Sequence, residues 1–178
     1  MDVLMSKKRL VLGGGCFWCV EAVFSNVKGV ISAVSAYTGG ARPNPTYENI
    51  CTGATGHAEV VDIAYDTELI SLNELLDIFF VIHNPTTLNA QGADKGTQYR
   101  SVIYYDNVQM KEQLLEYIKN IQSKFQDIIV TEVSELESVY EAEAYHQNYY
   151  AQNSSQGYCQ MVIAPKLQKF MTTFPELL

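Results

Sequence analysis

The segment at residues 13–19, GGGCFWC, constrains the fold more than any other part of the chain. An apolar run at residues 10–12 precedes it and predicts a strand. Four apolar residues follow it at the spacing of one helical face: Val20, Val23, Phe24 and Val27. The glycines therefore form a turn from a strand into a helix, with Cys16 at the start of the helix. Free N–H groups and the helix dipole favour a thiolate there, so we expect Cys16 to be a nucleophile.

Cys16 and Cys19 form a C-x-x-C pair, which has three interpretations. A zinc site needs a second pair of ligands, and neither Cys51, Cys159 nor the three histidines offer one. Thioredoxin-like dithiol exchange is the second interpretation. The third makes Cys16 a nucleophile in its own right, with Cys19 one helical turn later. Cys19 and Cys51 can also be simple small apolar residues of the core.

The composition predicts one domain over residues 1–178, since 178 residues with 47% hydrophobic content suffice for a core and no linker or repeat is present. A net charge of −8 argues against nucleic acid and anionic membranes as partners. No apolar run is long enough to span a membrane, and residues 1–8 lack the apolar region of a secretory signal. Four cysteines in such a chain indicate the reducing cytoplasm.

The rest of the chain alternates between strand and helix patterns, with long irregular segments at residues 41–56 and 84–99. Further strands are predicted at residues 30–37, 58–65, 101–105 and 128–133. Helices are predicted after the capping box that Ser71 opens, over residues 107–125 and 139–150, and briefly at residues 166–170. This order predicts a two-layer α/β sandwich (α+β class) with a mixed or antiparallel sheet.

Glu59 is the candidate general acid. Side chains alternate along a strand, so Glu59 shares a face with Val61 and Ile63. If that is the core face, burial raises the pKa of Glu59 and keeps a fraction protonated near neutral pH. An exposed carboxylate at a strand end is the alternative. Tyr47 and Tyr99 lie in or end the two long irregular segments, where a phenol can reach a ligand, whereas no histidine is assigned a catalytic role.

Several ordered segments resemble one known family, the A-class peptide methionine sulfoxide reductases. The similar segments are residues 15–18, 37–40, 43–47, 56–59, 96–101 and 157–159, in the order that the family has them. The resemblance extends over nearly the whole chain, from about residue 10 to residue 159. The resemblance implies an α/β sandwich around a ferredoxin-like core, with functional loops and an irregular, mobile C-terminal segment.

The resemblance also implies roles for single residues. These are Cys16 as the nucleophile on the sulfoxide sulfur; Phe17 and Trp18 as the apolar wall for the S-methyl group; Glu59, with Tyr47 and Tyr99, as the group that hydrogen-bonds and protonates the sulfoxide oxygen; Asp94 at the border of the site; and Cys159 as the resolving cysteine. Many members of the family have glycine where this chain has Cys19, so Cys19 is a rival to Cys159. Ala36 and Ala93 also replace residues common in the family, glycine and asparagine, and neither change removes a reacting group.

The implied reaction reduces methionine S-sulfoxide, free or in oxidised proteins, through a sulfenic acid and an intramolecular disulfide that thioredoxin resets. The family needs no metal or organic cofactor, and we expect a monomer. No cysteine follows Cys159 to relay the disulfide. Two other functions compete with this one. One is a general dithiol oxidoreductase, and the other is an acidic α/β binding module whose cysteines pack or bind zinc.

Overall fold

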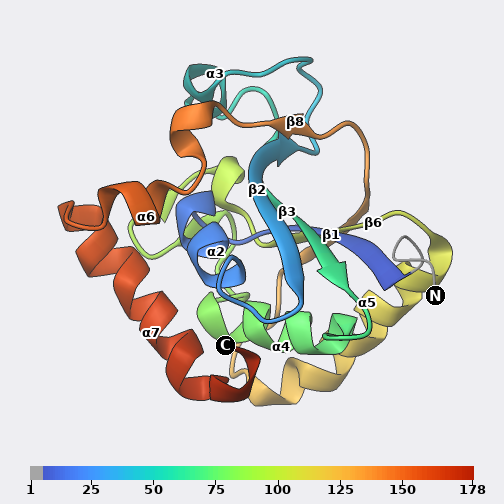
Figure 1. Ribbon diagram of the computed structural model, residues 1–178. Helices are drawn as coiled ribbons and strands as arrows, with labels where there is room; N and C mark the ends of the chain where they lie inside the picture. Colours follow the sequence, from blue (N-terminus) through green and yellow to red (C-terminus); the bar gives the residue numbers. More distant parts are fainter. Residues whose placement is uncertain (1–5) are drawn as a thin grey trace.

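The computed structural model describes residues 6–178, and its centre is a six-stranded sheet (Figure 1). The strands stand in the order β7-β6-β1-β3-β2-β8, and all neighbours are antiparallel except β6 and β7. Their bounds are β1 Lys7–Gly13, β2 Val30–Thr38, β3 Ala58–Asp66, β6 Val102–Tyr105, β7 Glu132–Glu135 and β8 Tyr140–Glu141. A separate small hairpin pairs β4 (Ala90–Gln91) with β5 (Asp94–Lys95). The mixed sheet agrees with the predicted fold class.

Within the described residues 6–178, six α-helices accompany these strands. They are α2 Phe17–Phe24, α3 Tyr47–Cys51, α4 Leu72–Ile82, α5 Val108–Ile121, α6 Tyr149–Asn153 and α7 Ala164–Thr173. Short 3₁₀ turns lie at Thr97–Tyr99, Gln122–Lys124, Ala144–His146 and Pro175–Leu177, and a π-helical turn at Cys159–Ile163 leads into α7. None of the helices within residues 6–178 combines the length and apolar character that a membrane crossing needs.

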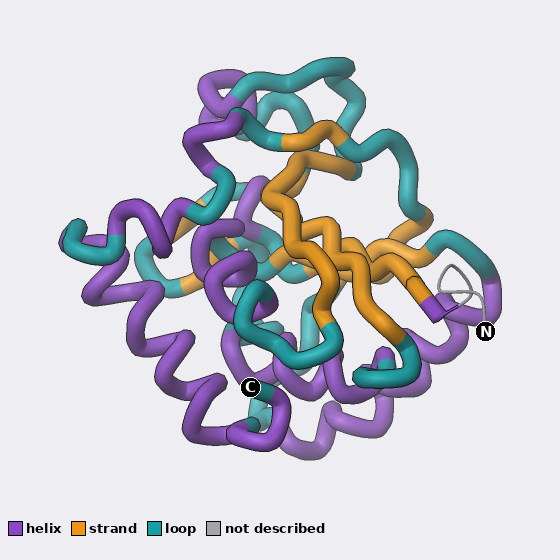
Figure 2. Tube along the Cα trace, viewed as in Figure 1, coloured by secondary structure: helices purple, strands orange, loops and turns teal. Residues whose placement is uncertain are grey.

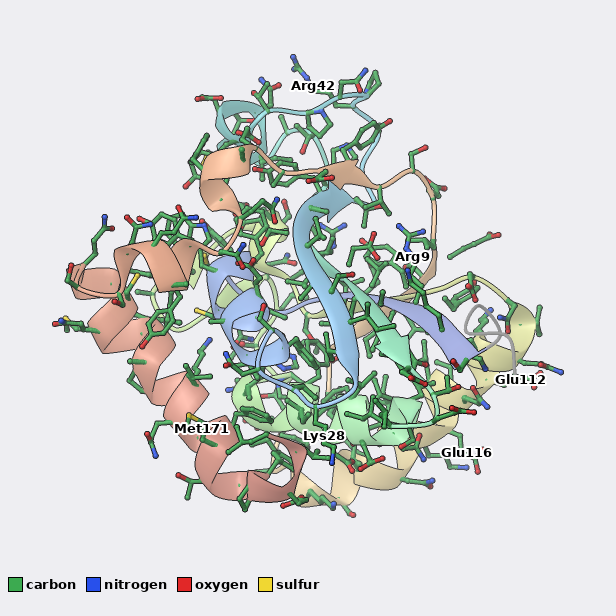
Figure 3. The ribbon with its side chains drawn as sticks, in the orientation of Figure 1. Arg9, Lys28, Arg42, Glu112, Glu116 and Met171 are labelled. Atoms are coloured by element: carbon green, nitrogen blue, oxygen red, sulfur yellow. The ribbon has the colours of Figure 1, made fainter. Side chains whose placement is uncertain are left out.

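The centre of the fold is ferredoxin-like, as expected. The elements β1, α2, β2, β3, α4 and β6 follow one another as β-α-β-β-α-β, and their strands stand in the order β6-β1-β3-β2. Figure 2 shows the strands in the middle, the helices along one side and below them, and loops at the opposite end. Arg42, in the long loop after β2, lies at that loop end, and Lys28, just before β2, lies toward the other (Figure 3).

The two faces of the sheet are covered unequally. The larger core cluster joins one face, which includes Leu12, Val61 and Ile63, to apolar residues of α2, α4, α5 and α7. The smaller cluster lies on the other face, around Val11 and Val60, and only partly buried side chains of the 136–139 segment cover it. Because side chains alternate along β3, Glu59 lies on the face of the larger core.

Local signals set several helix ends. The Ser71 side chain accepts from the N–H of Glu74, and the Glu74 side chain accepts from the N–H of Ser71, which confirms the predicted capping box. The Asn107 side chain caps α5 by accepting from the N–H of Met110. The helix ends at Ile121, where a 3₁₀ turn replaces its predicted extension to residue 125.

Two predictions about elements are wrong. The strand predicted at residues 128–133 begins only at Glu132, and Ile128 is 77% exposed. The helix predicted over residues 139–150 is replaced by strand β8, a 3₁₀ turn at Ala144–His146 and the start of α6 at Tyr149. Residues 140–141 pair with β2, and the N–H of Ala142 bonds the carbonyl of Ser35, so tertiary pairing outweighs local propensity there. The short helix predicted at residues 166–170 is confirmed and extends over Ala164–Thr173 as α7, within a C-terminal segment otherwise expected to be irregular.

Candidate active site

The glycine turn brings the end of β1 against β3. At Gly13 a side chain has no room, because its Cβ would meet the carbonyl oxygen of Glu59 on the neighbouring strand. Gly15 has a φ of +84°, which only glycine adopts without strain, and its N–H donates to the carbonyl of Tyr99 over 3.1 Å. The turn therefore gathers Cys16, Glu59 and Tyr99 around the start of α2.

Cys16 is the N-cap residue of α2, as predicted, but the expected thiolate is wrong for this state of the protein. Burial raises the pKa of the Cys16 thiol well above its ordinary value, and the charges of Glu59 and Cys19 raise it further. Hydrogen bonds from the backbone N–H of Trp18 and from the Tyr158 side chain favour the thiolate and oppose this rise. The backbone N–H at the start of the helix therefore reduces the free-energy cost of a buried Cys16 thiolate but does not cancel it.

Glu59 is only 2% exposed and faces the start of α2. Its Oε1 accepts the backbone N–H of Phe17 over 3.2 Å. Burial raises the pKa of Glu59 to about 8, while the Phe17 N–H lowers it and the charge of Asp94 raises it. The carboxyl group is therefore mostly protonated at neutral pH, which confirms the prediction that burial raises its pKa.

Tyr47 and Tyr99 flank the carboxyl group. Burial raises the pKa of Tyr99, and the charges of Glu59 and Cys16 raise it further. Burial likewise raises the pKa of Tyr47, with smaller contributions from its bond to Cys51 and from Glu59 and Tyr99. Both phenols are therefore proton donors around neutral pH, and they stand near the same carboxyl group. Tyr47 begins α3, a short helix inside the segment predicted to be irregular.

Phe17 and Trp18 lie in one cluster of aromatic side chains, the aromatic wall, and their contact with a substrate's S-methyl group stays a prediction. Trp18 stacks on Tyr149 with ring centres 3.6 Å apart and an interplanar angle of 4°. Its indole Nε1–H donates to Nδ1 of His146 over 3.0 Å, and the His146 ring lies 5.1 Å from that of Phe17. The ring of Tyr37 also packs against that of Phe17, with ring centres 5.6 Å apart. The wall is thus fixed by aromatic contacts and one partly buried hydrogen bond.

The sequence interpretation missed His146 as a part of this wall. It is 1% exposed, lies 4.7 Å from the ring of Tyr47, and accepts from Trp18, so it is a neutral imidazole with its proton on Nε2. Burial lowers its pKa, and the charges of Glu143 and Glu48 oppose this. A lone histidine in a segment predicted to be helical gave no signal of this position.

Glu143 organises the neighbouring loops and was also missed. Its carboxylate accepts from the hydroxyl groups of Tyr37 and Tyr145 and from the N–H of Tyr47, each over 3.1 Å. These bonds, together with one to its own backbone, hold the pKa of Glu143 below its ordinary value although burial raises it. The carboxylate thereby ties the start of α3 to β2 and fixes where the Tyr47 side chain begins.

Asp94 lies on β5 and borders the site through Tyr158. The Tyr158 hydroxyl donates to Asp94 Oδ2 over 2.7 Å and lies 3.9 Å from the sulfur of Cys19. The ring of Tyr158 packs edge-on against Trp18, with centres 5.8 Å apart. Tyr158 entered the sequence interpretation only as part of a motif, and the structure makes it the link between Cys19, Asp94 and the aromatic wall.

The four cysteines are all free, and they differ in their surroundings. Cys19 lies beside Cys16, whereas Cys159 is wholly buried in the larger core. Cys51 is exposed and bonds Tyr47. Within residues 6–178, no three His, Cys, Asp or Glu side chains converge in a way that could hold a metal ion.

Comparison with known proteins agrees with this geometry. The family described as peptide methionine sulfoxide reductase matches residues 8–177. The peptide methionine sulfoxide reductase MsrA of Polynucleobacter asymbioticus is 53% identical over 177 residues, which cover 98% of this chain and 93% of that protein. The reduced form of Mxr1 from Saccharomyces cerevisiae has a TM-score of 0.83 and 33% identity, covering 87% of this chain and 90% of Mxr1.

A second structure of the yeast protein, Mxr1 in complex with Trx2, has a TM-score of 0.59 and 24% identity, covering 82% of this chain and 86% of that one, and shares the fold. The family match spans almost the whole chain, and the bacterial relative covers it with more than half of the residues identical. A free cysteine at a helix start, a protonated carboxyl group and an aromatic wall stand together within that match. The chain belongs to the peptide methionine sulfoxide reductase family.

Proposed function

We propose that residues 1–178 form a single catalytic domain that reduces methionine S-sulfoxide, free or in oxidised proteins, to methionine. The observation that carries this proposal is that Cys16 lies close to the carboxyl group of Glu59, and that burial raises the pKa of this carboxyl group to about 8. A sulfoxide sulfur is a poor electrophile until its oxygen is protonated or strongly hydrogen-bonded. An acid that stays protonated at neutral pH, beside a thiol, supports this reaction class.

The substrate sits between the wall and the acid. Its S-methyl group packs on Phe17 and Trp18, and its oxygen accepts hydrogen bonds from Glu59, Tyr47 and Tyr99. The charge of Glu59 raises the pKa of Cys16, so a Cys16 thiolate forms more readily beside a neutral Glu59 than beside a charged one. A neutral Glu59 with a Cys16 thiolate is also the pair that attack on a protonated sulfoxide needs.

The step balances without an added cofactor. The Cys16 thiolate attacks the sulfoxide sulfur while Glu59 protonates the oxygen. The resulting hydroxyl group passes to the Cys16 sulfur as the methionine S–O bond breaks, so methionine is reduced and Cys16 is oxidised to a sulfenic acid. A second thiol then displaces water and leaves an intramolecular disulfide. Cys159 by resemblance and Cys19 by position are the candidates for that thiol.

An external dithiol must restore the enzyme, and we assign this role to thioredoxin. The structure of yeast Mxr1 in complex with Trx2 supports this assignment, since Mxr1 shares the fold of this chain. The proposal needs no metal and no organic cofactor. Four free cysteines, of which Cys51 is exposed, fit a reducing compartment, and we place the enzyme in the cytoplasm.

Turnover of the two epimers of methionine sulfoxide by the wild type and by Cys16→Ser, with a dithiol present, tests the proposal. We expect the wild type to form methionine from the S epimer alone and C16S to form none. Full turnover by C16S would overturn the proposal. Reduction of insulin disulfides at equal rates by the wild type and Glu59→Gln, without sulfoxide reduction, would favour a general dithiol oxidoreductase.

A further inference from the structure

We infer that Cys19 captures the Cys16 sulfenic acid first, and that Tyr158 and Asp94 accept the proton that Cys19 must lose. This inference rests on the proposed function, because it concerns the step that follows sulfoxide reduction. It assigns a catalytic role to Cys19 and positioning roles to Tyr158 and Asp94, in addition to the roles of the aromatic wall and Glu59.

The backbone geometry already suits a disulfide between Cys16 and Cys19. The N–H of Cys19 donates to the carbonyl of Cys16 over 3.1 Å, which closes a turn of i to i+3 spacing at the start of α2. The Cα atoms across such a turn lie within about 7 Å, and most disulfides join Cα atoms about 4.4–6.8 Å apart. No rearrangement of an element is needed, so the thiol acts at a high effective concentration.

The Tyr158 hydroxyl provides a route for the proton. Its own hydrogen is donated to Asp94 Oδ2 over 2.7 Å, so its oxygen is left to accept. The Cys19 sulfur lies 3.9 Å from that oxygen and is therefore the donor of this contact. Loss of the thiol proton to Tyr158, with transfer of the Tyr158 proton to Asp94, leaves a Cys19 thiolate.

One nearby charge and one hydrogen bond support this thiolate. Burial raises the pKa of Cys19, and the charges of Asp94 and Glu59 raise it further, whereas the Lys166 ammonium group and the Tyr158 hydroxyl lower it. Protonation of Asp94 in the transfer removes one of the two opposing charges. The Lys166 Nζ lies 4.0 Å from the position that a Cβ on Gly15 would have, which places a positive charge beside the glycine turn. No salt bridge is found for Lys166 among the described residues, so its charge is free to act on the sulfur.

Cys159 has none of these features. Its exposed fraction is 0%, burial alone raises its pKa, and it lies in the π-helical turn that leads into α7. The residue before it, Tyr158, is held by Asp94 and by its edge contact with Trp18. Cys159 must therefore leave the core before it can reach Cys16, whereas Cys19 is already beside it.

The atoms and electrons of the disulfide-forming step balance. The Cys19 thiolate attacks the Cys16 sulfur, the S–O bond breaks, and the hydroxide that leaves takes up the proton held on Asp94 to become water. Both sulfurs finish in the disulfide, so no further oxidant is required.

The test gives the reduced, full-length protein one equivalent of methyl p-tolyl sulfoxide without a reductant. Samples are quenched with acid at increasing times, alkylated, and mapped by mass spectrometry, while the sulfide product is counted. We expect one sulfide per chain and a first disulfide that maps to Cys16–Cys19. Cys51 is exposed and belongs to neither candidate disulfide, so its thiol should be alkylated at every time point and is the internal control.

Substitutions of Cys159 and of Cys19 separate the roles of the two candidate thiols. We expect Cys159→Ser to form the same disulfide at the wild-type rate. We expect Cys19→Ser and Cys19→Ala to release the sulfide at the wild-type rate. Their disulfide should form at least about tenfold more slowly, and dimedone should trap the Cys16 sulfenic acid that accumulates. A first disulfide at Cys16–Cys159, or a trapped sulfenic acid in C159S but not in C19S, would overturn the inference alone. Absence of the sulfide product would overturn the proposed function with it.

A last variant tests the proton route. Tyr158→Phe keeps the ring against Trp18 and removes the hydroxyl between Cys19 and Asp94. We expect its disulfide step to slow near neutral pH and to recover as the pH rises and the thiol ionises without help. A pH profile that matches the wild type would show that Tyr158 takes no part in the transfer and would overturn that part of the inference.

Discussion

The backbone N–H of Phe17 donates to Oε1 of Glu59 over 3.2 Å, and this bond joins the helix of the nucleophile to the strand of the acid. It engages one carboxyl oxygen and leaves the other free to carry the proton toward a substrate. It also fixes the carboxyl group one residue from Cys16. The acid and the thiol are thus positioned by a main-chain donor, which does not change rotamer when the substrate enters.

Glu59→Gln should abolish most of the activity while the fold persists. Glutamine keeps the size of the side chain and an oxygen for the Phe17 N–H, but it has no acidic proton. We expect the single-turnover rate to fall by about 10²- to 10⁴-fold. The wild-type rate should also decline as the pH rises past about 8, where Glu59 ionises, and E59Q should lack this decline. A rate for E59Q close to that of the wild type would remove Glu59 from the reaction.

The same substitution should stabilise the protein at alkaline pH. The folded pKa of Glu59, about 8, lies above the value of about 4.5 that the unfolded chain has. Between these values the folded state binds more protons, so its stability falls as the pH rises and stays low above 8. E59Q avoids this loss, and its free energy of unfolding should exceed that of the wild type by a few kcal/mol at pH 9.

Urea denaturation of both proteins at pH 5 and pH 9 measures this effect. The gain should shrink or vanish at pH 5, where Glu59 is protonated in the folded state. An equal difference at both values would show that the carboxyl group does not titrate as its burial indicates.

Gly13→Ala should destabilise the junction of β1 with β3. A Cβ at this position meets the backbone oxygen of Glu59, and a backbone atom cannot turn aside as a flexible side chain can. We expect a loss of about 1–3 kcal/mol in the free energy of unfolding, measured by urea denaturation. Gly157→Ala is the matched control, since open space surrounds that glycine. Equal effects of the two substitutions would contradict the close approach.

Part of this site could be predicted from the sequence, because its signals are local. Cys16 stands where a strand, a glycine turn and a helix meet, and the alternation of β3 places Glu59 on the core face. His146 and Tyr158 could not be found in this way. His146 follows β8, whose pairing with β2 is long-range and outweighs the local pattern. Tyr158 is held by contacts with Asp94 and Trp18, which are distant in the sequence. The raised pKa of Cys16 also depends on burial, which the pattern around the helix start does not show.

Trp18→Phe should weaken substrate binding more than it slows chemistry. The substitution keeps an apolar ring but removes the indole N–H, so Nδ1 of the buried His146 loses its donor. An unsatisfied buried acceptor costs about 1–3 kcal/mol, and the wall should loosen around the S-methyl group. We expect KM for methionine sulfoxide to rise by a larger factor than kcat falls, as steady-state kinetics with a dithiol can measure. Tyr149→Phe is the control, because it keeps the ring that stacks on Trp18 and loses only a hydroxyl group bonded to Gln156 at the surface. If Y149F raised KM as much as W18F, the rise in W18F could not be assigned to the lost bond to His146.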